Sequence, residues 1–188
     1  ALRDVRRHLV IEAGGLSTLL DTGSPVSIGR GGTLQLAGRA WDPADDESPL
    51  LSQLSAWLGR RIDWLVGMDI LATVPVVIDG PRQRITFGET PDARAGARVP
   101  VDLRYLVPEV TLCHADAAAV AFLDTGAPVS YAAPGAVRGR RPDSTETAFY
   151  PLVGPFTTPL YRLAASLGGR PLAARGGGLP PPPAPARR

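Results

Sequence analysis

Apolar and polar positions alternate in short segments along the chain, and Gly, Pro or Asp residues separate these segments. Runs of roughly four to eight residues with this alternation are typical of half-buried β-strands. One stretch has helical spacing instead: Ser48-Pro49 precedes apolar residues at 50, 51, 54, 57 and 58, which predicts a helix with Ser48 as its N-cap and Trp57 on its packing face. The pattern therefore predicts an all-β protein with short helices, and we expect strands over Leu9–Ala13, Leu16–Leu20, Thr33–Leu36, Ile62–Val66, Val99–Leu106, Val110–Cys113, Ala117–Leu123, Val129–Ala132, Thr145–Tyr150 and Leu160–Leu167.

One segment occurs twice. Leu20–Ser27 (LDTGSPVS) returns as Leu123–Ser130 (LDTGAPVS), with a single difference after the glycine, and an apolar run precedes each copy. The two aspartates are 124 − 21 = 103 residues apart, about half of the 188-residue chain. A motif that recurs at half-chain spacing indicates a duplicated unit.

The chemistry of the repeat begins with its carboxylates, Asp21 and Asp124. Each follows an apolar strand and precedes a glycine that allows a tight turn, so each acid is expected at the end of a buried strand. If the two halves face each other, the two carboxylates share one site. Such a pair cannot ionise twice without a large cost, so it holds one proton at mildly acidic pH and titrates as a unit. It can act as a base on a water molecule and donate a proton to a substrate oxygen.

Both copies of the repeat resemble the active-site loops of aspartic proteases. Leu65-Val66-Gly67, followed by Met68 to Leu71, resembles the second motif of that family, two apolar residues and a glycine that open a short helix. In retropepsin-like proteins this segment crosses behind the active-site loop and supports it. The stretches 74–80 and 84–88 resemble the closing hairpin of such a unit. Retropepsins are dimers of one unit, whereas pepsins carry two in one chain, and this sequence is similar to the pepsin arrangement at retropepsin size.

The resemblance implies an acid-protease-like β-barrel with two pseudo-symmetric small lobes, and an aspartic endopeptidase that needs no cofactor or metal. It implies that Ser24 and the threonines of the two turns hold the carboxylates coplanar through hydrogen bonds. The implied catalytic residues are Asp21 and Asp124, the active-site loops are supported by Thr22, Gly23, Ser24, Thr125, Gly126 and Ala127, and the buttress is Leu65, Val66 and Gly67.

The second half departs from this pattern. Its candidate buttress, Pro151–Gly154, ends only 154 − 124 = 30 residues after Asp124, whereas the interval in the first half is 67 − 21 = 46 residues. The residues after Gly154 do not predict a short helix, so Pro151–Pro159 is alternatively the flap of the second unit. We expect a first lobe over residues 1–90, a second and incomplete lobe over 99–175, and a disordered Pro-rich tail over 176–188.

Two other residues have competing interpretations. Trp41 lies in an acidic loop where a flap over a substrate cleft is expected, and it is otherwise a half-buried tryptophan in a solvated loop. Asp69 lies at the start of the short helix, where a carboxylate can accept hydrogen bonds from free backbone N–H groups, so we expect a structural role for it.

Composition excludes several classes of function. A net charge of +2 without a lysine-rich block argues against nucleic-acid binding, and the loop with Arg138, Arg140 and Arg141 is expected to face solvent. The single cysteine, Cys113, rules out an internal disulfide, and two histidines are too few for a usual zinc site. No apolar run approaches the roughly 20 residues of a membrane span, and the first residues do not read as a secretory signal, which favours a cytoplasmic location.

The expected partner is a peptide or protein substrate, bound by a monomer that is an internal pseudo-dimer. Two alternatives remain open at the level of the sequence. One is a catalytically inactive binding module that keeps the β-fold, and the other is a retropepsin-type homodimer that uses Asp21 from two chains.

Overall fold

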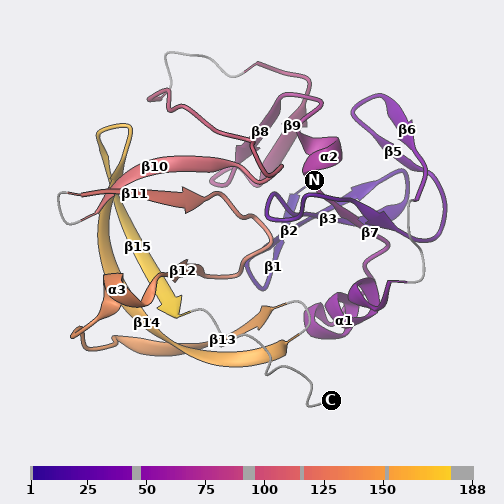
Figure 1. Ribbon diagram of the computed structural model, residues 1–188. Helices are drawn as coiled ribbons and strands as arrows, with labels where there is room; N and C mark the ends of the chain where they lie inside the picture. Colours follow the sequence, from indigo (N-terminus) through magenta and orange to yellow (C-terminus); the bar gives the residue numbers. More distant parts are fainter. Residues whose placement is uncertain (1, 44–47, 91–95, 115–116, 151–152, 179–188) are drawn as a thin grey trace, which may run out of the picture.

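The computed structural model describes residues 2–43, 48–90, 96–114, 117–150 and 153–178. The chain is mostly β-strand, with three short helices among these residues, α1 (Pro49–Leu58), α2 (Met68–Leu71) and α3 (Pro134–Val137). The strands fall into two larger sheets and two hairpins, and within these ranges no strand pair joins residues 2–90, here called the first half, to residues 96–178, the second half. Figure 1 shows the two halves side by side, with α1 of the first half next to β13 of the second.

The first half is built on a five-stranded sheet in the order β1-β2-β3-β7-β4. β1, β2 and β3 form an antiparallel meander, β3 pairs with β7 in parallel, and β7 pairs with β4 in antiparallel orientation. β7 therefore lies between the strand that enters the Asp21 turn and the strand that leaves it. The bounds are β1 (Leu2–Val5), β2 (His8–Ala13), β3 (Leu16–Leu20), β4 (Ile28–Gly29) and β7 (Trp64–Val66).

Side chains on both faces of this sheet are buried, because successive residues of a strand point to opposite faces. Leu20, Trp64 and Val66 belong to one core cluster, while Leu19 and Leu65 belong to another, into which α1 packs its own leucines. Ser48 caps α1 by accepting a hydrogen bond from the backbone N–H of residue 50, as its sequence predicts. Two hairpins complete the half: β5 (Leu34–Leu36) with β6 (Arg39–Trp41), and β8 (Val76–Asp79) with β9 (Arg84–Phe87).

The second half is a six-stranded sheet in the order β11-β10-β14-β15-β12, with β13 paired to β14. Its core cluster is small, with Val129, Ala148 and Leu160 buried and Tyr131 and Phe156 packed against them. The bounds are β10 (Glu109–His114), β11 (Ala117–Phe122), β12 (Ser130–Ala132), β13 (Ser144–Tyr150), β14 (Gly154–Leu167) and β15 (Arg170–Gly178).

The predicted barrel is not present among the described residues. Each sheet is open, with edges at β1 and β4 in the first half and at β11 and β12 in the second. A barrel closes only when its last strand pairs with its first, and neither pair of edges meets in that way. The coarser prediction of an all-β protein with short helices is confirmed.

Two strand or loop predictions in the second half are wrong. Val99–Leu106 is not a strand: it contains a single bridge from Asp102 to Glu109, and Leu106 has a positive φ of 54°. Pro100 lacks the N–H that a ladder requires, which disfavours a strand at the start of this stretch. The loop predicted over 135–143 begins with α3, and its three arginines are exposed, as predicted.

The predicted tail begins too early, because β15 continues to Gly178. A Cβ at Gly176 would overlap Leu163 Cδ1, and one at Gly177 would lie 2.7 Å from Thr158 Cγ2. These glycines are therefore used for close packing within the sheet. Residues 179–188 of the predicted tail lie outside the described residues.

Candidate functional site

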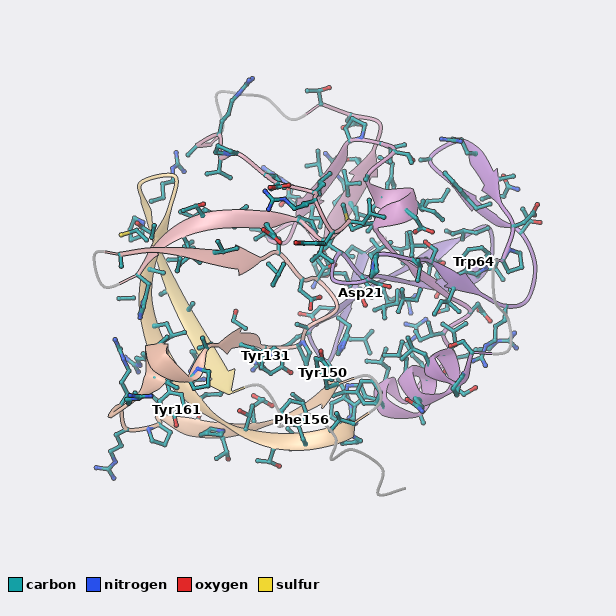
Figure 2. All side chains as sticks on the ribbon, in the orientation of Figure 1. Asp21, Trp64, Tyr131, Tyr150, Phe156 and Tyr161 are labelled. Atoms are coloured by element: carbon teal, nitrogen blue, oxygen red, sulfur yellow. The ribbon has the colours of Figure 1, made fainter. Side chains whose placement is uncertain are left out.

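The two Asp-Thr-Gly turns meet between the halves of the molecule and bind each other reciprocally. The Thr22 N–H donates to Thr125 Oγ1 at 3.1 Å, and the Thr125 N–H donates to Thr22 Oγ1 at 3.0 Å. The Thr22 hydroxyl donates to the Leu123 carbonyl at 2.5 Å, and the Thr125 hydroxyl donates to the Leu20 carbonyl at 2.9 Å. Each threonine thus ties its own turn to the strand that enters the other turn. Figure 2 places Asp21 at the junction of the two halves.

Each aspartate lies against the glycine of the opposite turn. A Cβ built on Gly23 would lie 2.5 Å from Asp124 Oδ1, and one built on Gly126 would lie 2.5 Å from Asp21 Oδ2. Real Cβ atoms do not approach this closely, so a side chain at either position would have to displace the opposing carboxyl group. The repeat therefore brings both carboxyl groups into one site, each in contact with the other turn.

Backbone N–H groups orient both carboxylates in matching ways. Asp21 Oδ1 accepts a hydrogen bond from the Gly23 N–H at 2.9 Å. Asp124 Oδ1 accepts hydrogen bonds from the N–H groups of Gly126 and Ala127, at 2.8 and 3.0 Å. Asp21 is half-buried and Asp124 is exposed, so the site opens to solvent on the side of the second turn.

Burial, followed by the nearby charge of Asp124, raises the pKa of Asp21 to about 7. The hydrogen bond from Gly23 opposes this shift in pKa because it stabilises the ionised form. Asp21 therefore keeps its proton in mildly acidic solution, which is the behaviour expected of a carboxyl pair that shares a proton.

The predicted buttress lies directly behind the first turn. The Asp21 N–H donates to the Val66 carbonyl at 2.9 Å, which continues the parallel pairing of Leu20 with Val66. The Met68 N–H donates to the Ser24 carbonyl at 2.8 Å. A Cβ at Gly67 would lie 2.5 Å from the Val26 carbonyl oxygen, so the glycine allows the two backbones to touch.

Asp69 has the structural role that its sequence position predicts. Its carboxylate accepts hydrogen bonds from the Ser27 hydroxyl at 2.6 Å and the Ser27 N–H at 3.0 Å, and also from the Ile70 N–H at 2.9 Å. The Ser27 hydroxyl in turn accepts a hydrogen bond from the Gly67 N–H at 2.9 Å. This chain of hydrogen bonds joins α2 to the segment that follows the Asp21 turn.

The hydroxyl groups of the turns have different partners from those expected. Ser24 donates to the Val26 carbonyl at 2.7 Å, within its own turn, and the two threonines bind backbone atoms of the opposite strand. These hydroxyl groups therefore hold the backbones of the turns together, and the N–H groups orient the carboxylates.

Trp41, the predicted flap residue, lies on β6 and is half-buried against the first-half core. Its indole N–H donates to the Leu36 carbonyl at 3.4 Å, and the Arg39 guanidinium lies 4.4 Å from its ring centroid. These contacts agree with the packing alternative, and a role over the substrate stays a prediction.

The second turn has no equivalent of β7 within the described residues. Among the described strands, β11, which enters this turn, pairs only with β10 and forms an edge of its sheet. Val120 and Phe122 on β11 are 68% and 59% exposed, whereas Leu19 and Leu20 on the corresponding β3 are each 1% exposed. Of the candidate second buttress, Pro151 and Leu152 lie outside the described residues, and Val153 and Gly154 lie where β13 turns into β14.

Two residues near the site, His8 and Tyr131, are not among those that the sequence predicts. His8, on β2, is 1% exposed. Burial is the largest cause of its lowered pKa, and the negative charge of Asp124 acts against this lowering. Burial, followed by the charge of Asp124 and by Tyr150, raises the pKa of Tyr131 to about 12. Tyr131 directly follows the second copy of the repeat, and this position was the available signal.

No cluster of three or more His, Cys, Asp or Glu side chains suited to a metal ion occurs in the described part of the chain. Within the same ranges, no helix combines the length and apolarity needed to cross a membrane. No protein-family model matches the sequence, and a search of curated proteins found no match.

Proposed function

We propose that the protein is an aspartic endopeptidase in which Asp21 and Asp124 form the catalytic pair. The observation that carries this proposal is the reciprocal binding of the two turns, which puts each carboxyl group against the glycine of the other turn. Surface turns would have no reason to exclude a Cβ at both glycines or to use both threonine hydroxyl groups across the junction.

The reaction follows from one proton shared by two carboxyl groups. The ionised carboxylate removes a proton from a water molecule, and the water oxygen forms a bond to the peptide carbonyl carbon. The protonated carboxyl group donates its proton to the carbonyl oxygen, which gives a tetrahedral diol. A proton then passes to the peptide nitrogen, the C–N bond breaks, and the products are a carboxylic acid and an amine. The raised pKa of Asp21, about 7, supports its role as the proton donor in mildly acidic solution.

Cleavage of a denatured protein at mildly acidic pH tests the proposal. We expect Asp21→Asn and Asp124→Asn each to abolish cleavage, because each removes one of the two proton carriers. Asp102→Asn is the matched control, since Asp102 is exposed and lies outside the junction, and it should retain activity. Full activity in Asp124→Asn would overturn the intrachain pair.

The retropepsin-type homodimer is less compatible with this arrangement. Thr22 already uses its N–H and its hydroxyl on Thr125 and Leu123 of the same chain. A dimer built on Asp21 from two chains would have to displace the second half from these hydrogen bonds.

An inactive binding module is the second candidate, and the bare edge of β11 favours it. Among the described residues, the second turn lacks a counterpart of the strand that supports the first, and Asp124 is exposed. Absence of cleavage by the wild-type chain, together with retained binding of a statine-type peptide, would favour this candidate over the protease.

A further inference from the structure

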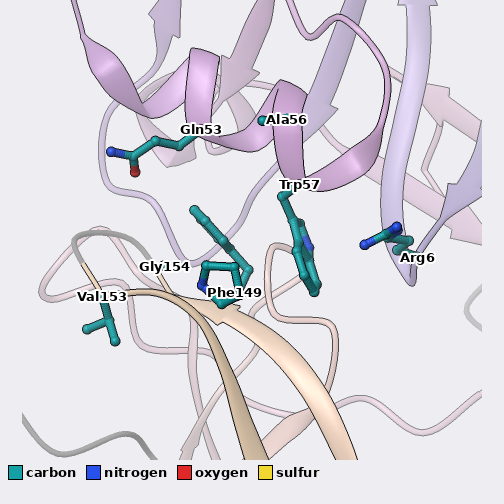
Figure 3. A pocket seen from close by; sticks show the side chains of 8 residues that line it. Arg6, Gln53, Ala56, Trp57, Phe149, Val153 and Gly154 are labelled. Carbon is teal, nitrogen blue, oxygen red and sulfur yellow. The ribbon is translucent and has the colours of Figure 1, made fainter.

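A hollow of about 490 Å³ is lined by residues of α1 in the first half and of the β13–β14 hairpin in the second. Figure 3 shows the Trp57 ring between Arg6 on one side and Phe149 on the other. The Trp57 and Phe149 rings are stacked with centroids 5.9 Å apart, and the Arg6 guanidinium lies 4.8 Å from the Trp57 centroid. The hollow therefore has an apolar aromatic wall with a cation at one end.

The hollow leads toward the second active-site turn. A neighbouring hollow of about 340 Å³ is also lined by Arg6 and Trp57, and it reaches Pro128. Pro128 belongs to the repeated turn segment that contains Asp124. A peptide lying in the two hollows would thus extend toward the carboxyl pair.

Arg6 is held in this place by a strained turn. Arg6 and Arg7 join β1 to β2 as a two-residue hairpin loop, with φ values of 49° and 66°. Such loops favour Asn-Gly because both residues need a positive φ, and a residue with a long side chain is strained there. The Asp4 carboxylate braces the loop by accepting the Arg7 N–H at 2.7 Å, and His8 Nδ1 lies 3.0 Å from the Arg6 carbonyl oxygen. Strain that neighbouring side chains maintain is typical of functional positions.

The two arginines differ in their partners. Arg7 pairs with Glu146 on β13 at 3.2 Å, so its charge is balanced across the junction. Arg6 forms no ion pair within the described ranges, and its guanidinium lies over the Trp57 ring. Arginine can accept a carboxylate with two parallel hydrogen bonds while it stacks on an aromatic ring, so Arg6 is placed to bind a carboxylate that enters the hollow.

We infer that this hollow, here called the Arg6 groove, binds an extended peptide through an acidic side chain that pairs with Arg6. The Arg6 guanidinium stacks on one side of Trp57, so the carboxylate can bind its free N–H groups while the rest of the peptide lies along the apolar wall of the hollow. The inference rests on the proposed function and deepens it, because it names the substrate class as peptides with an acidic side chain.

Binding to a chain that cannot cleave separates this inference from the proposed reaction. The protein is the full chain with Asp21→Asn and Asp124→Asn, and the probes are two fluorescent peptides with the segment Ala-Leu-Ala-Glu-Ala or Ala-Leu-Ala-Gln-Ala. We expect the Glu peptide to bind about 2- to 5-fold more tightly than the Gln peptide at low salt, the range of an ion pair with an exposed arginine. Arg6→Gln in the same background should remove the preference, and Arg6→Lys should keep part of it, since lysine retains the charge but not the planar pair of donors.

Arg138→Gln is the matched control, because Arg138 does not line either hollow, and it should leave the preference unchanged. Equal binding of the two peptides, or a preference that survives Arg6→Gln, would overturn the Arg6 groove. A wild-type chain that cleaves both peptides equally would keep the protease and reject the groove. A chain that cleaves neither peptide but prefers the Glu peptide would keep the groove and reject the protease.

Discussion

At the scale of single residues, Thr22 and Thr125 form equivalent hydrogen bonds, each from its own turn to the opposite one. Each hydroxyl accepts the N–H of the other threonine and donates to a carbonyl of the opposite entering strand. Since one hydroxyl satisfies two backbone groups at the junction, removing it leaves both without that partner. The two threonines therefore form one network and should not contribute independently.

We expect Thr22→Val and Thr125→Val each to lower the free energy of unfolding by about 1–3 kcal/mol, because each leaves junction backbone groups unpaired. The double variant should cost about 1 kcal/mol less than the sum of the two. Urea unfolding measures the free energy of unfolding of the two single variants and the double variant. Thr33→Val is the control, since its hydroxyl donates to the nearby exposed Asp42. Additive effects would contradict a shared network.

The raised pKa of Asp21 predicts how stability changes with pH. The folded chain binds the Asp21 proton more tightly than the unfolded chain, so this contribution is full below the usual aspartate pKa of about 4 and is lost as pH rises through about 7. The loss should amount to roughly 2–4 kcal/mol. Urea unfolding across this pH range should show a steeper fall for the wild type than for Asp21→Asn. Parallel curves would show that Asp21 titrates alike in the folded and unfolded chains.

The sequence is most informative at this scale, because the repeat by itself identifies Asp21 and Asp124 as the candidate pair. It does not assign the partners of the hydroxyl groups. Whether Ser24 donates to a carboxylate or to the Val26 carbonyl depends on how closely the two turns approach, and that distance is set by packing between the halves. The sequence also does not predict the turn at Arg6 and Arg7, because Arg-Arg is not a usual sequence for a tight hairpin loop.

At the scale of elements, β7 supports the first turn by pairing with both β3 and β4. Gly67 follows this strand and precedes α2, and its φ of −95° is available to any residue. The need for glycine there comes from contact, because an added Cβ would meet the carbonyl oxygens of Val26 and Ser24 at 2.5 and 2.7 Å.

Gly67→Ala should therefore lower the free energy of unfolding by about 1–3 kcal/mol, as expected when an atom is forced into a packed site. Peptide cleavage should also decrease, because displacement of this backbone moves Asp21 relative to Asp124. The control is Gly80→Ala, where an added Cβ meets nothing within 4 Å and the change should stay within about 0.5 kcal/mol. Thermal unfolding of both variants tests the difference. If Gly67→Ala were as stable as Gly80→Ala, the backbone around Val26 and Ser24 would accommodate the added Cβ without a loss of stability.

Local patterns predict most elements of the first half. The cap at Ser48, the β2–β3 hairpin and the closing β8–β9 hairpin each depend on a few neighbouring residues. The second half is harder because its pairings are distant in sequence: β12 pairs in parallel with β15, through Ser130 and Gly176. The glycine-rich sequence at the end of β15 predicts a flexible tail, because the side chains that pack against these glycines are distant in the sequence.

At the scale of the whole molecule, the halves are joined by more than the two turns. Phe149 of β13 is buried in the cluster that contains Leu51, Leu54 and Leu58 of α1, and it stacks on Trp57. The second half has only a small cluster of its own among the described residues, so this contact is a large part of what holds it in place.

Phe149→Ala should cost about 3–5 kcal/mol, the usual range for removing a buried phenylalanine. Phe122→Ala is a matched control in the same half, because Phe122 is 59% exposed on the edge strand β11, and its change should stay within about 0.5 kcal/mol. Urea unfolding followed by tryptophan fluorescence compares them. A loss of similar size at Phe122 would mean that the β11 face is covered in solution.

The central claim is that Asp21 and Asp124 act as one acid pair, and a carboxyl-detected NMR titration tests it most directly. In the wild type, Asp21 should titrate with an apparent pKa of about 7. In Asp124→Asn this pKa should fall, because the charge of Asp124 is gone, while remaining above the usual value because burial is its largest cause. An Asp21 that titrates at the usual value in the wild type, or whose titration is unchanged by Asp124→Asn, would contradict the account.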